Sequence, residues 1–200
     1  MEKILLTSAG FLNKKVAEKF IELCGKPSRE IRVIFVPTAS RSDEELKYVK
    51  ESYKELLDLG IKDIKTLELD HTIKTDEVAG YDVIYVCGGN SFYLLNKIRE
   101  SEFDRILNGF DGVYVGVSAG SIVAGPDIET AAPWDENDVD LRNTKGLGFV
   151  DFAVAPHYEE SDKDVIDEWK KKVSYEIKEI TDNQAVLVEG DEVELVGSIK

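Results

Sequence analysis

The sequence has few of the residues that build metal centres or disulfide frameworks. Its 200 residues include two cysteines, Cys24 and Cys87, and two histidines, His71 and His157. Their spacing is not that of metal ligands, so we expect no bound metal. So few cysteines fit a reducing compartment, in which both thiols would be free core residues.

Long apolar runs are also missing. No segment approaches the roughly 18 apolar residues that span a membrane, so we expect no membrane partner. The N-terminus, MEKILLTSAG, turns polar too early for a signal peptide, which predicts a cytoplasmic protein. A hydrophobic fraction of 42% with 32% charged residues is typical of a globular chain. The length suits a single domain over residues 1–200.

Basic residues are outnumbered. The chain has 25 lysines and arginines against 40 aspartates and glutamates, a net charge of −15. An acidic surface repels the phosphate backbone of nucleic acids, and the few lysine runs are diluted by glutamates. We therefore expect no nucleic-acid partner.

Short apolar runs alternate with amphipathic helical segments in most of the chain. The pattern predicts strands at 3–10, 31–40, 64–70, 81–90 and 112–120, and helices at 13–25, 42–60 and 91–107. This alternation favours an α/β fold with an open, mostly parallel sheet. The tail AVLVEGDEVELVGS alternates apolar and acidic residues around Gly190 and Asp191, which predicts a C-terminal β-hairpin.

Details of three segments can be predicted as well. Ser42 is expected to cap the helix at 42–60, and a second amphipathic helix is expected after residue 158. The predicted inward residues of these helices are Leu46, Val49, Tyr53, Leu56 and Leu57 in the first, and Val165, Trp169, Val173 and Ile177 in the second. The apolar run FAVAPH is expected to be a strand that brings His157 to the ligand-binding edge of the sheet.

Four predicted strands end in small, polar or glycine residues. In an open α/β sheet the ligand lies beyond the carboxyl ends of the strands, so these endings should converge on one site. The endings are Thr7-Ser8-Ala9-Gly10, Pro37-Thr38-Ala39-Ser40-Arg41, Gly88-Gly89-Asn90 and Ser118-Ala119-Gly120.

The stretch YVGVSAGSIVAG, residues 114–125, is typical of a strand that turns sharply into a helix at Ser118. A nucleophilic serine at such a turn needs small neighbours, and Gly116 and Gly120 supply them. The motif alone also fits a small-residue turn that only packs against the sheet. Both interpretations stay open at this point.

Acyl transfer needs an oxyanion site and a base as well as a nucleophile. The N–H of Ala119 and one from Gly88 or Gly89 could bind the oxyanion, whereas a phosphate loop is disfavoured because no GxGxxG or GK[S/T] motif is present. His71 lies in a polar connection and is expected to be a surface residue. His157 follows an apolar strand and is the candidate base.

In this order and spacing, CGGNSFYLL, GVSAGSIVAG and APHY resemble the peptidase E family, serine peptidases that include aspartyl dipeptidase and, more distantly, cyanophycinase. The resemblance implies a three-layer α/β sandwich, like the flavodoxin-like fold of class I glutamine amidotransferases, with a C-terminal β-hairpin. It implies a nucleophile at Ser118, a base at His157 and oxyanion donors at Gly88, Gly89 and Ala119. The implied partner is a small peptide, including dipeptides with N-terminal aspartate. We expect the protein to be a monomer or homodimer.

The third triad member and the substrate-binding residues stay open. Asp182, just before the hairpin, is the favoured acid because the family places an acid there, usually glutamate. Asp135 is the alternative, in a region where the family has an aspartate linked to activity. An aspartyl substrate would need a cation. The candidate substrate-binding residues are Asn90, Arg41 and Lys163, with Arg142 as a further cation.

The expected mechanism is covalent, through an acyl-enzyme on Ser118, and needs no cofactor. An amidotransferase-type glutaminase is disfavoured because it would need cysteine at this turn. Two alternatives are kept: a non-catalytic binding module and a cyanophycinase-like hydrolase on the same scaffold.

Overall fold

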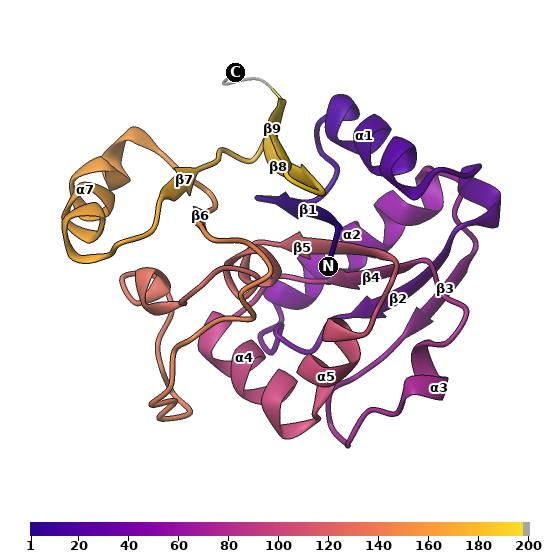
Figure 1. Cartoon of the computed structure of the whole chain (residues 1–200), viewed down its shortest axis with the longest axis horizontal. Coiled ribbons are helices and arrows are strands. Elements are labelled where there is room, and N and C mark those ends of the chain that lie inside the picture. The colour runs from indigo at the N-terminus through magenta and orange to yellow at the C-terminus, as the bar shows by residue number, and fades with distance from the viewer. Residues whose placement is uncertain (198–200) are drawn as a thin grey trace.

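Five parallel strands and an antiparallel hairpin form the central sheet of the computed structural model, which describes residues 1–197 (Figure 1). The strand order is β3-β2-β4-β5-β1-β8-β9, and only β8 and β9 run antiparallel to their neighbours. The strands are β1 (Lys3–Thr7), β2 (Arg32–Val36), β3 (Asp63–Thr66), β4 (Val83–Val86), β5 (Val113–Val117), β8 (Gln184–Glu189) and β9 (Glu192–Gly197). All residues of β4 and β5 are buried, as expected for strands covered on both faces.

Helices cover both faces of this sheet. An apolar cluster joins the sheet to α1 (Lys14–Cys24) and α2 (Glu45–Asp58) on one face. A second cluster joins it to α4 (Ser91–Glu100), α5 (Phe103–Asn108) and the one-turn helix α6 (Ala119–Ile122) on the other, together with the short α3 (Thr75–Val78). The predicted three-layer α/β fold is confirmed.

Residues 126–180 form a smaller lobe beside the main sheet (Figure 1). Its strands β6 (Ala153–Ala155) and β7 (Ile177–Glu179) pair only with each other, in parallel, and α7 (Lys163–Lys172) packs on them through Ile166. The strand before His157 is thus not part of the main sheet, although it does bring His157 to the carboxyl ends of the main strands, as expected. Strand β1 pairs with β5 on one side and with β8 on the other.

Two helix predictions also need correction. The single helix expected at 91–107 is broken between α4 and α5, because Glu102 adopts a left-handed conformation with φ 55° and the Ser101 hydroxyl bonds back to the Lys97 carbonyl. The helix expected after residue 158 ends at Lys172, and Ile177 lies in β7 instead.

The predicted inward faces are partly wrong. In α2, Leu56 is buried but Leu46 and Leu57 are exposed. In α7, Ile166 is the buried residue and Val165 is exposed. The Ser42 hydroxyl does accept the N–H of Glu45, although the regular helix starts at Glu45 rather than at once after Ser42.

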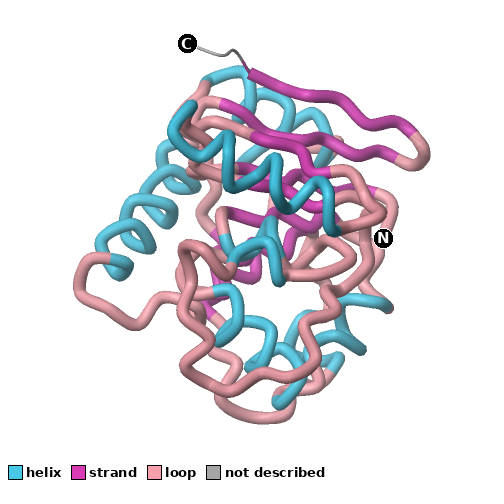
Figure 2. The backbone as a smooth tube through the Cα atoms, turned by 90° about the vertical axis from the view of Figure 1, so that its left-hand side faces the viewer, coloured by secondary structure: helices cyan, strands magenta, loops and turns pink. Residues whose placement is uncertain are grey.

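The C-terminal hairpin is confirmed and is prominent in Figure 2. Strand β8 pairs antiparallel with β1, in register Leu5↔Leu187, which carries residues 181–183 to the carboxyl end of β1. Cys87 is buried, as predicted, and Cys24 is half-buried. None of the helices within residues 1–197 is long and apolar enough to cross a lipid bilayer.

Adjacent leucines on α2 provide a test of this packing. Leu56 is 0% exposed and Leu57 is 47% exposed. We expect Leu56→Ala to lower the free energy of unfolding by about 2–5 kcal/mol, because it leaves a cavity between α2 and the sheet. Leu57→Ala, the matched control, should cost less than about 1 kcal/mol. Urea denaturation measures both, and equal effects would contradict the burial described here.

Candidate active site

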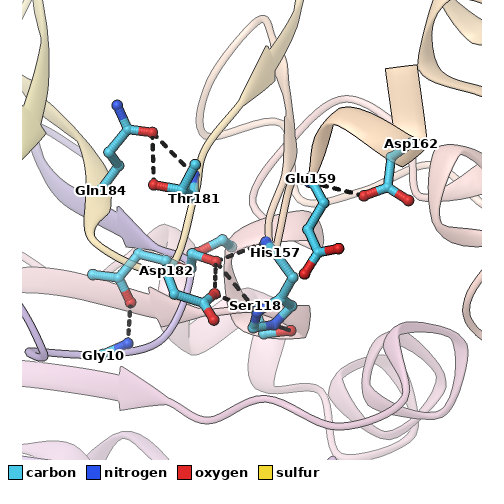
Figure 3. A network of polar contacts seen from close by, with 11 residues as sticks. Gly10, Ser118, His157, Glu159, Asp162, Thr181, Asp182 and Gln184 are labelled. Carbon is cyan, nitrogen blue, oxygen red and sulfur yellow. Dashed lines mark hydrogen bonds and ion pairs between the residues drawn. The ribbon is translucent and has the colours of Figure 1, made fainter. Parts of the chain in front are cut away.

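Three segments far apart in the chain meet at the carboxyl ends of the parallel strands (Figure 3). Ser118 follows β5, His157 follows β6 in the smaller lobe, and Asp182 precedes β8. The site is therefore formed between the main sheet, its hairpin and the lobe.

Their side chains form one hydrogen-bonded chain. The Ser118 Oγ lies 2.9 Å from Nε2 of His157, and Nδ1 of His157 lies 2.6 Å from Oδ1 of Asp182. In Figure 3 the imidazole lies between the serine and the carboxylate. With Nδ1 protonated towards Asp182, Nε2 is left as an acceptor for the Ser118 hydroxyl. About half of each side chain of the His157–Asp182 pair is exposed, so the site opens to solvent.

The backbone at Ser118 is held in a rare conformation, with φ 49° and ψ −109°. Its N–H donates to the Thr7 carbonyl and its carbonyl accepts from Ser121 and Ile122. A Cβ on Gly120 would overlap the Val86 carbonyl oxygen, so only glycine fits there. Strain of this kind persists only where neighbouring structure enforces it, and it is common at functional sites.

Ser8 connects the other two members of the chain. Its buried hydroxyl accepts the backbone N–H of His157 at 2.7 Å and donates to Oδ1 of Asp182 at 2.8 Å. His157 also has a left-handed backbone, with φ 57°. Sequence reasoning placed Ser8 at a strand end without assigning it this contact, because the only signal is a small polar residue after β1.

The loop that contains Gly88 and Gly89 lies close to Ser118. A Cβ on Gly88 would lie 3.1 Å from the Ser118 Cβ, which shows how closely this loop approaches the serine. Gly89 has φ 130°, and a side chain there would overlap Ala39. Within residues 1–197, the backbone hydrogen bonds leave the N–H groups of Gly88, Gly89 and Ala119 without an acceptor. These groups are thus available to a bound oxyanion.

Asp135 occupies a different position from Asp182. Its Oδ2 accepts the N–H of Ser91 at 2.8 Å, at the start of α4. Burial raises the pKa of its carboxyl, and the hydrogen bonds from Ser91 offset this only in part. The structure brings Asp182, and not Asp135, within hydrogen-bonding distance of the imidazole.

The other predicted substrate-binding residues are engaged elsewhere. Arg41 pairs with Asp138 at 2.7 Å and stacks on the Tyr93 ring, and Lys163 pairs with Asp167 on its own helix. Asn90 caps α4 and donates to the Glu136 carbonyl.

The remaining polar candidates also lie outside the serine site. Arg142 is exposed. His71 is an exposed residue between Asp70 and Glu77, and hydrogen bonds to these carboxylates raise its pKa. In the described part of the chain, no three His, Cys, Asp or Glu side chains form a group that could hold a metal ion.

Two cavities adjoin Ser118 and His157. The first, of about 390 Å³, extends past Gly88 and Gly89 to α2. The second, of about 310 Å³, extends under the lobe past Trp134, Asp135 and Ile166. A further hollow, of about 430 Å³, lies at the opposite end of the strands and contains neither residue.

A strained strand-to-helix serine beside a histidine–aspartate pair is the arrangement of hydrolytic enzymes that use a serine nucleophile. The sequence comparison agrees with this class. The model of peptidase family S51 matches residues 4–196, and the chain belongs to this family.

Related proteins cover most of the chain. An uncharacterised peptidase of Listeria innocua is 31% identical, with 80% of this chain and 82% of that protein covered. A peptidase E of Salmonella paratyphi A is 28% identical over 79% of this chain and 69% of its own length. The crystal structure of a candidate peptidase E from Listeria monocytogenes EGD-e is 30% identical, covers 99% of both chains and has a TM-score of 0.81. The chain therefore resembles peptidases in sequence and in fold.

The close packing at the serine turn can be tested with one methyl group. We expect Gly120→Ala to destabilise the protein by about 1–3 kcal/mol or more, because its Cβ would overlap the backbone of β4. Gly109→Ala is the control, since its nearest neighbour would be 3.7 Å from the new Cβ. Thermal and urea unfolding compare the two, and a Gly120→Ala variant as stable as the control would contradict the packing.

The raised pKa of Asp135 predicts a pH dependence. A carboxyl whose pKa is higher in the folded than in the unfolded state lowers the free energy of unfolding as pH rises. The loss occurs between its unfolded pKa and its folded pKa. Asp135→Asn removes this loss, so its stability relative to the unmodified protein should increase between about pH 3 and pH 7.

Glu77→Gln is the control of opposite sign. The N–H of Lys74 and the His71 side chain lower the pKa of Glu77, so its contribution is present at neutral pH and lost on acidification. The stability of Glu77→Gln relative to the unmodified protein should thus fall as pH rises. Urea unfolding across the pH range measures both slopes, and slopes of the same sign would refute the assignment.

Proposed function

We propose that this protein is a serine peptidase that hydrolyses short peptides through an acyl-enzyme on Ser118. The observation that carries the proposal is the unbroken hydrogen-bonded chain from the Ser118 hydroxyl through His157 to Asp182. Membership of a peptidase family supports the reaction class.

In this mechanism His157 acts first as a base. Its Nε2 removes the proton from Ser118 as Oγ attacks the scissile carbonyl carbon. The proton then passes from Nε2 to the leaving amine, and the acyl group remains on Oγ. Water, deprotonated by the same nitrogen, then attacks the ester carbon. The bond to Oγ breaks, Nε2 returns the proton to Oγ, and the acid product leaves.

The amides around the serine would stabilise the charge that develops on the carbonyl oxygen. We assign this role to the N–H of Ala119 and those of Gly88 and Gly89, because they have no acceptor within residues 1–197 and belong to segments that lie next to Ser118. Each such donor contributes about 100-fold or more to turnover in serine enzymes.

We assign the acid of the triad to Asp182. Its carboxylate is 2.6 Å from Nδ1, where it can hold the imidazole in the productive tautomer and stabilise the imidazolium. Ser8, which donates to the same carboxylate oxygen, is assigned as a positioning residue. Asp135 is engaged with the first turn of α4 and does not have this geometry.

The substrate class rests on the cavities beside Ser118. Their volumes suit a few amino-acid side chains, which favours short peptides. Preference for N-terminal aspartate, which the resemblance to peptidase E implies, stays a prediction. Among the described residues that line these two cavities there is no lysine or arginine to pair with an aspartyl carboxylate.

The triad assignment predicts unequal effects of two matched substitutions. Asp182→Asn should lower kcat about 1,000-fold or more, because asparagine cannot stabilise the imidazolium. Asp135→Asn should have a much smaller effect. Ser118→Ala should abolish acyl-enzyme formation. Cleavage of a dipeptide panel, X-Leu, followed by mass spectrometry gives the rates.

Labelling with a fluorophosphonate separates the peptidase from a non-catalytic binding module, since only an activated serine reacts readily. Absence of labelling in the folded protein would refute the proposal. Labelling without dipeptide cleavage would favour a cyanophycinase-like hydrolase. A larger loss of kcat in Asp135→Asn than in Asp182→Asn would reverse the assignment of the acid.

A further inference from the structure

The cavity beside Gly88 and Gly89 is lined by several negatively charged side chains. Its lining includes four carboxylates, and no lysine or arginine among the described residues. The carboxylates belong to Glu45, Glu51, Glu55 and Asp182. Three of them project from α2, opposite the proposed nucleophile.

Glu55 is a half-buried carboxylate among these four. One oxygen accepts the N–H of Phe11 at 2.9 Å, but no salt bridge of residues 1–197 involves Glu55. Burial, together with the charges of Glu51 and Asp58, raises the pKa of its carboxyl in spite of that hydrogen bond. A half-buried carboxylate of this kind gains most from a bound cation.

The Tyr85 hydroxyl lies near Glu55 inside the protein. The Tyr85 hydroxyl is fully buried beside Glu55 and Ser52, and it makes no hydrogen bond of normal geometry within the described chain. Both side chains reach Gly10: a Cβ there would be 2.6 Å from the Glu55 carboxylate and 3.3 Å from the Tyr85 oxygen. Tyr85 and Gly10 do not line the cavity, so they pack against Glu55 from within the protein and form no part of the ligand site.

We propose that this cavity binds a positively charged group of the peptide substrate. The inference rests on the proposed peptidase function and names its substrate class: peptides with lysine or arginine at the residue whose carbonyl is attacked. The α-ammonium of an unblocked peptide offers the same chemistry and is the other possible source of the cation. An aspartyl carboxylate would instead be repelled by Glu51, Glu55 and Asp182.

The second cavity, as far as residues 1–197 show, also has no basic side chain that could bind an aspartyl carboxylate. It is lined by Asp135, Glu159 and Asp162 along with apolar side chains, and the described residues place no lysine or arginine there. Both sides of Ser118 thus favour cationic over anionic groups, in accord with the net charge of −15.

The test compares kcat/KM for four substrates: Lys-Leu, norleucyl-Leu, Asp-Leu and N-acetyl-Lys-Leu. We expect Lys-Leu to exceed norleucyl-Leu by about tenfold, since a charge-assisted hydrogen bond is worth about that ratio. Asp-Leu should be slower still. If the α-ammonium is the cation bound, Lys-Leu and norleucyl-Leu will be equal and N-acetylation will abolish cleavage. Asp-Leu as the best substrate, or indifference to both charges, would overturn the proposal.

Substitutions on α2 test whether the preference for a cationic substrate arises in this cavity. Glu55→Gln should lower kcat/KM for the cationic substrate about tenfold, and the more exposed Glu51→Gln about two- to fivefold. Asp58→Asn is the matched control, because it removes the same charge from the same helix outside the cavity lining. Glu51→Gln also covers the case in which Glu55→Gln fails to fold. Equal effects of Glu51→Gln and Asp58→Asn would refute the cavity as the binding place.

Binding to the Ser118→Ala variant separates this inference from the proposed function. Calorimetry with Lys-Leu and Asp-Leu measures cation preference without turnover. If Ser118 is labelled by a fluorophosphonate but Asp-Leu binds more tightly, the function stands and the inference falls. The opposite result is also possible: Ser118 is not labelled, Lys-Leu binds more tightly than Asp-Leu, and Glu51→Gln weakens the binding of Lys-Leu. In that case the inference stands and the peptidase function falls.

Discussion

The pairing of β1 with β5 on one side and β8 on the other is the constraint on which the site depends. It sets Thr7 between Val117 and Ala185, so the residues that follow β5 and precede β8 meet at the end of β1. The buried Ser8 lies at that point and bonds both to the His157 backbone and to Asp182. A single hydroxyl thereby joins the sheet, the hairpin and the lobe.

Backbone strain is concentrated at this junction. Four non-glycine residues of the described chain have positive φ, and two of them are Ser118 and His157. Such conformations cost on the order of 1–3 kcal/mol each and need a rigid surrounding. The hydrogen bonds from Ser118 to β1 and α6, and from His157 to Ser8, provide it. The imidazole and the hydroxyl are thus held in place before any ligand arrives.

The charges around the site are arranged unevenly. The two basic residues that the sequence offered as substrate ligands form ion pairs instead. Arg41 pairs with Asp138, and Lys163 pairs with Asp167. The salt bridges of residues 1–197 include none of the three α2 glutamates that line the cavity beside Ser118, so this lining stays negative. Family resemblance transfers the reaction class more safely than specificity, because specificity depends on these few side chains.

The sequence by itself determined the layered α/β fold, the serine turn and the C-terminal hairpin, because each depends on a local pattern: alternating apolar runs, glycines around Ser118, and period-two polarity in the tail. The tertiary structure alone decided which groups meet. The strand before His157 joins a separate two-stranded sheet, whereas β8 pairs with β1. Ser8 and Asp182 lie next to strands and Asp135 lies in a loop, but in the sequence all three are simply small polar residues. Only the register of β8 against β1 brings Asp182 to the imidazole, while Asp135 is held by the N–H of Ser91 at the start of α4.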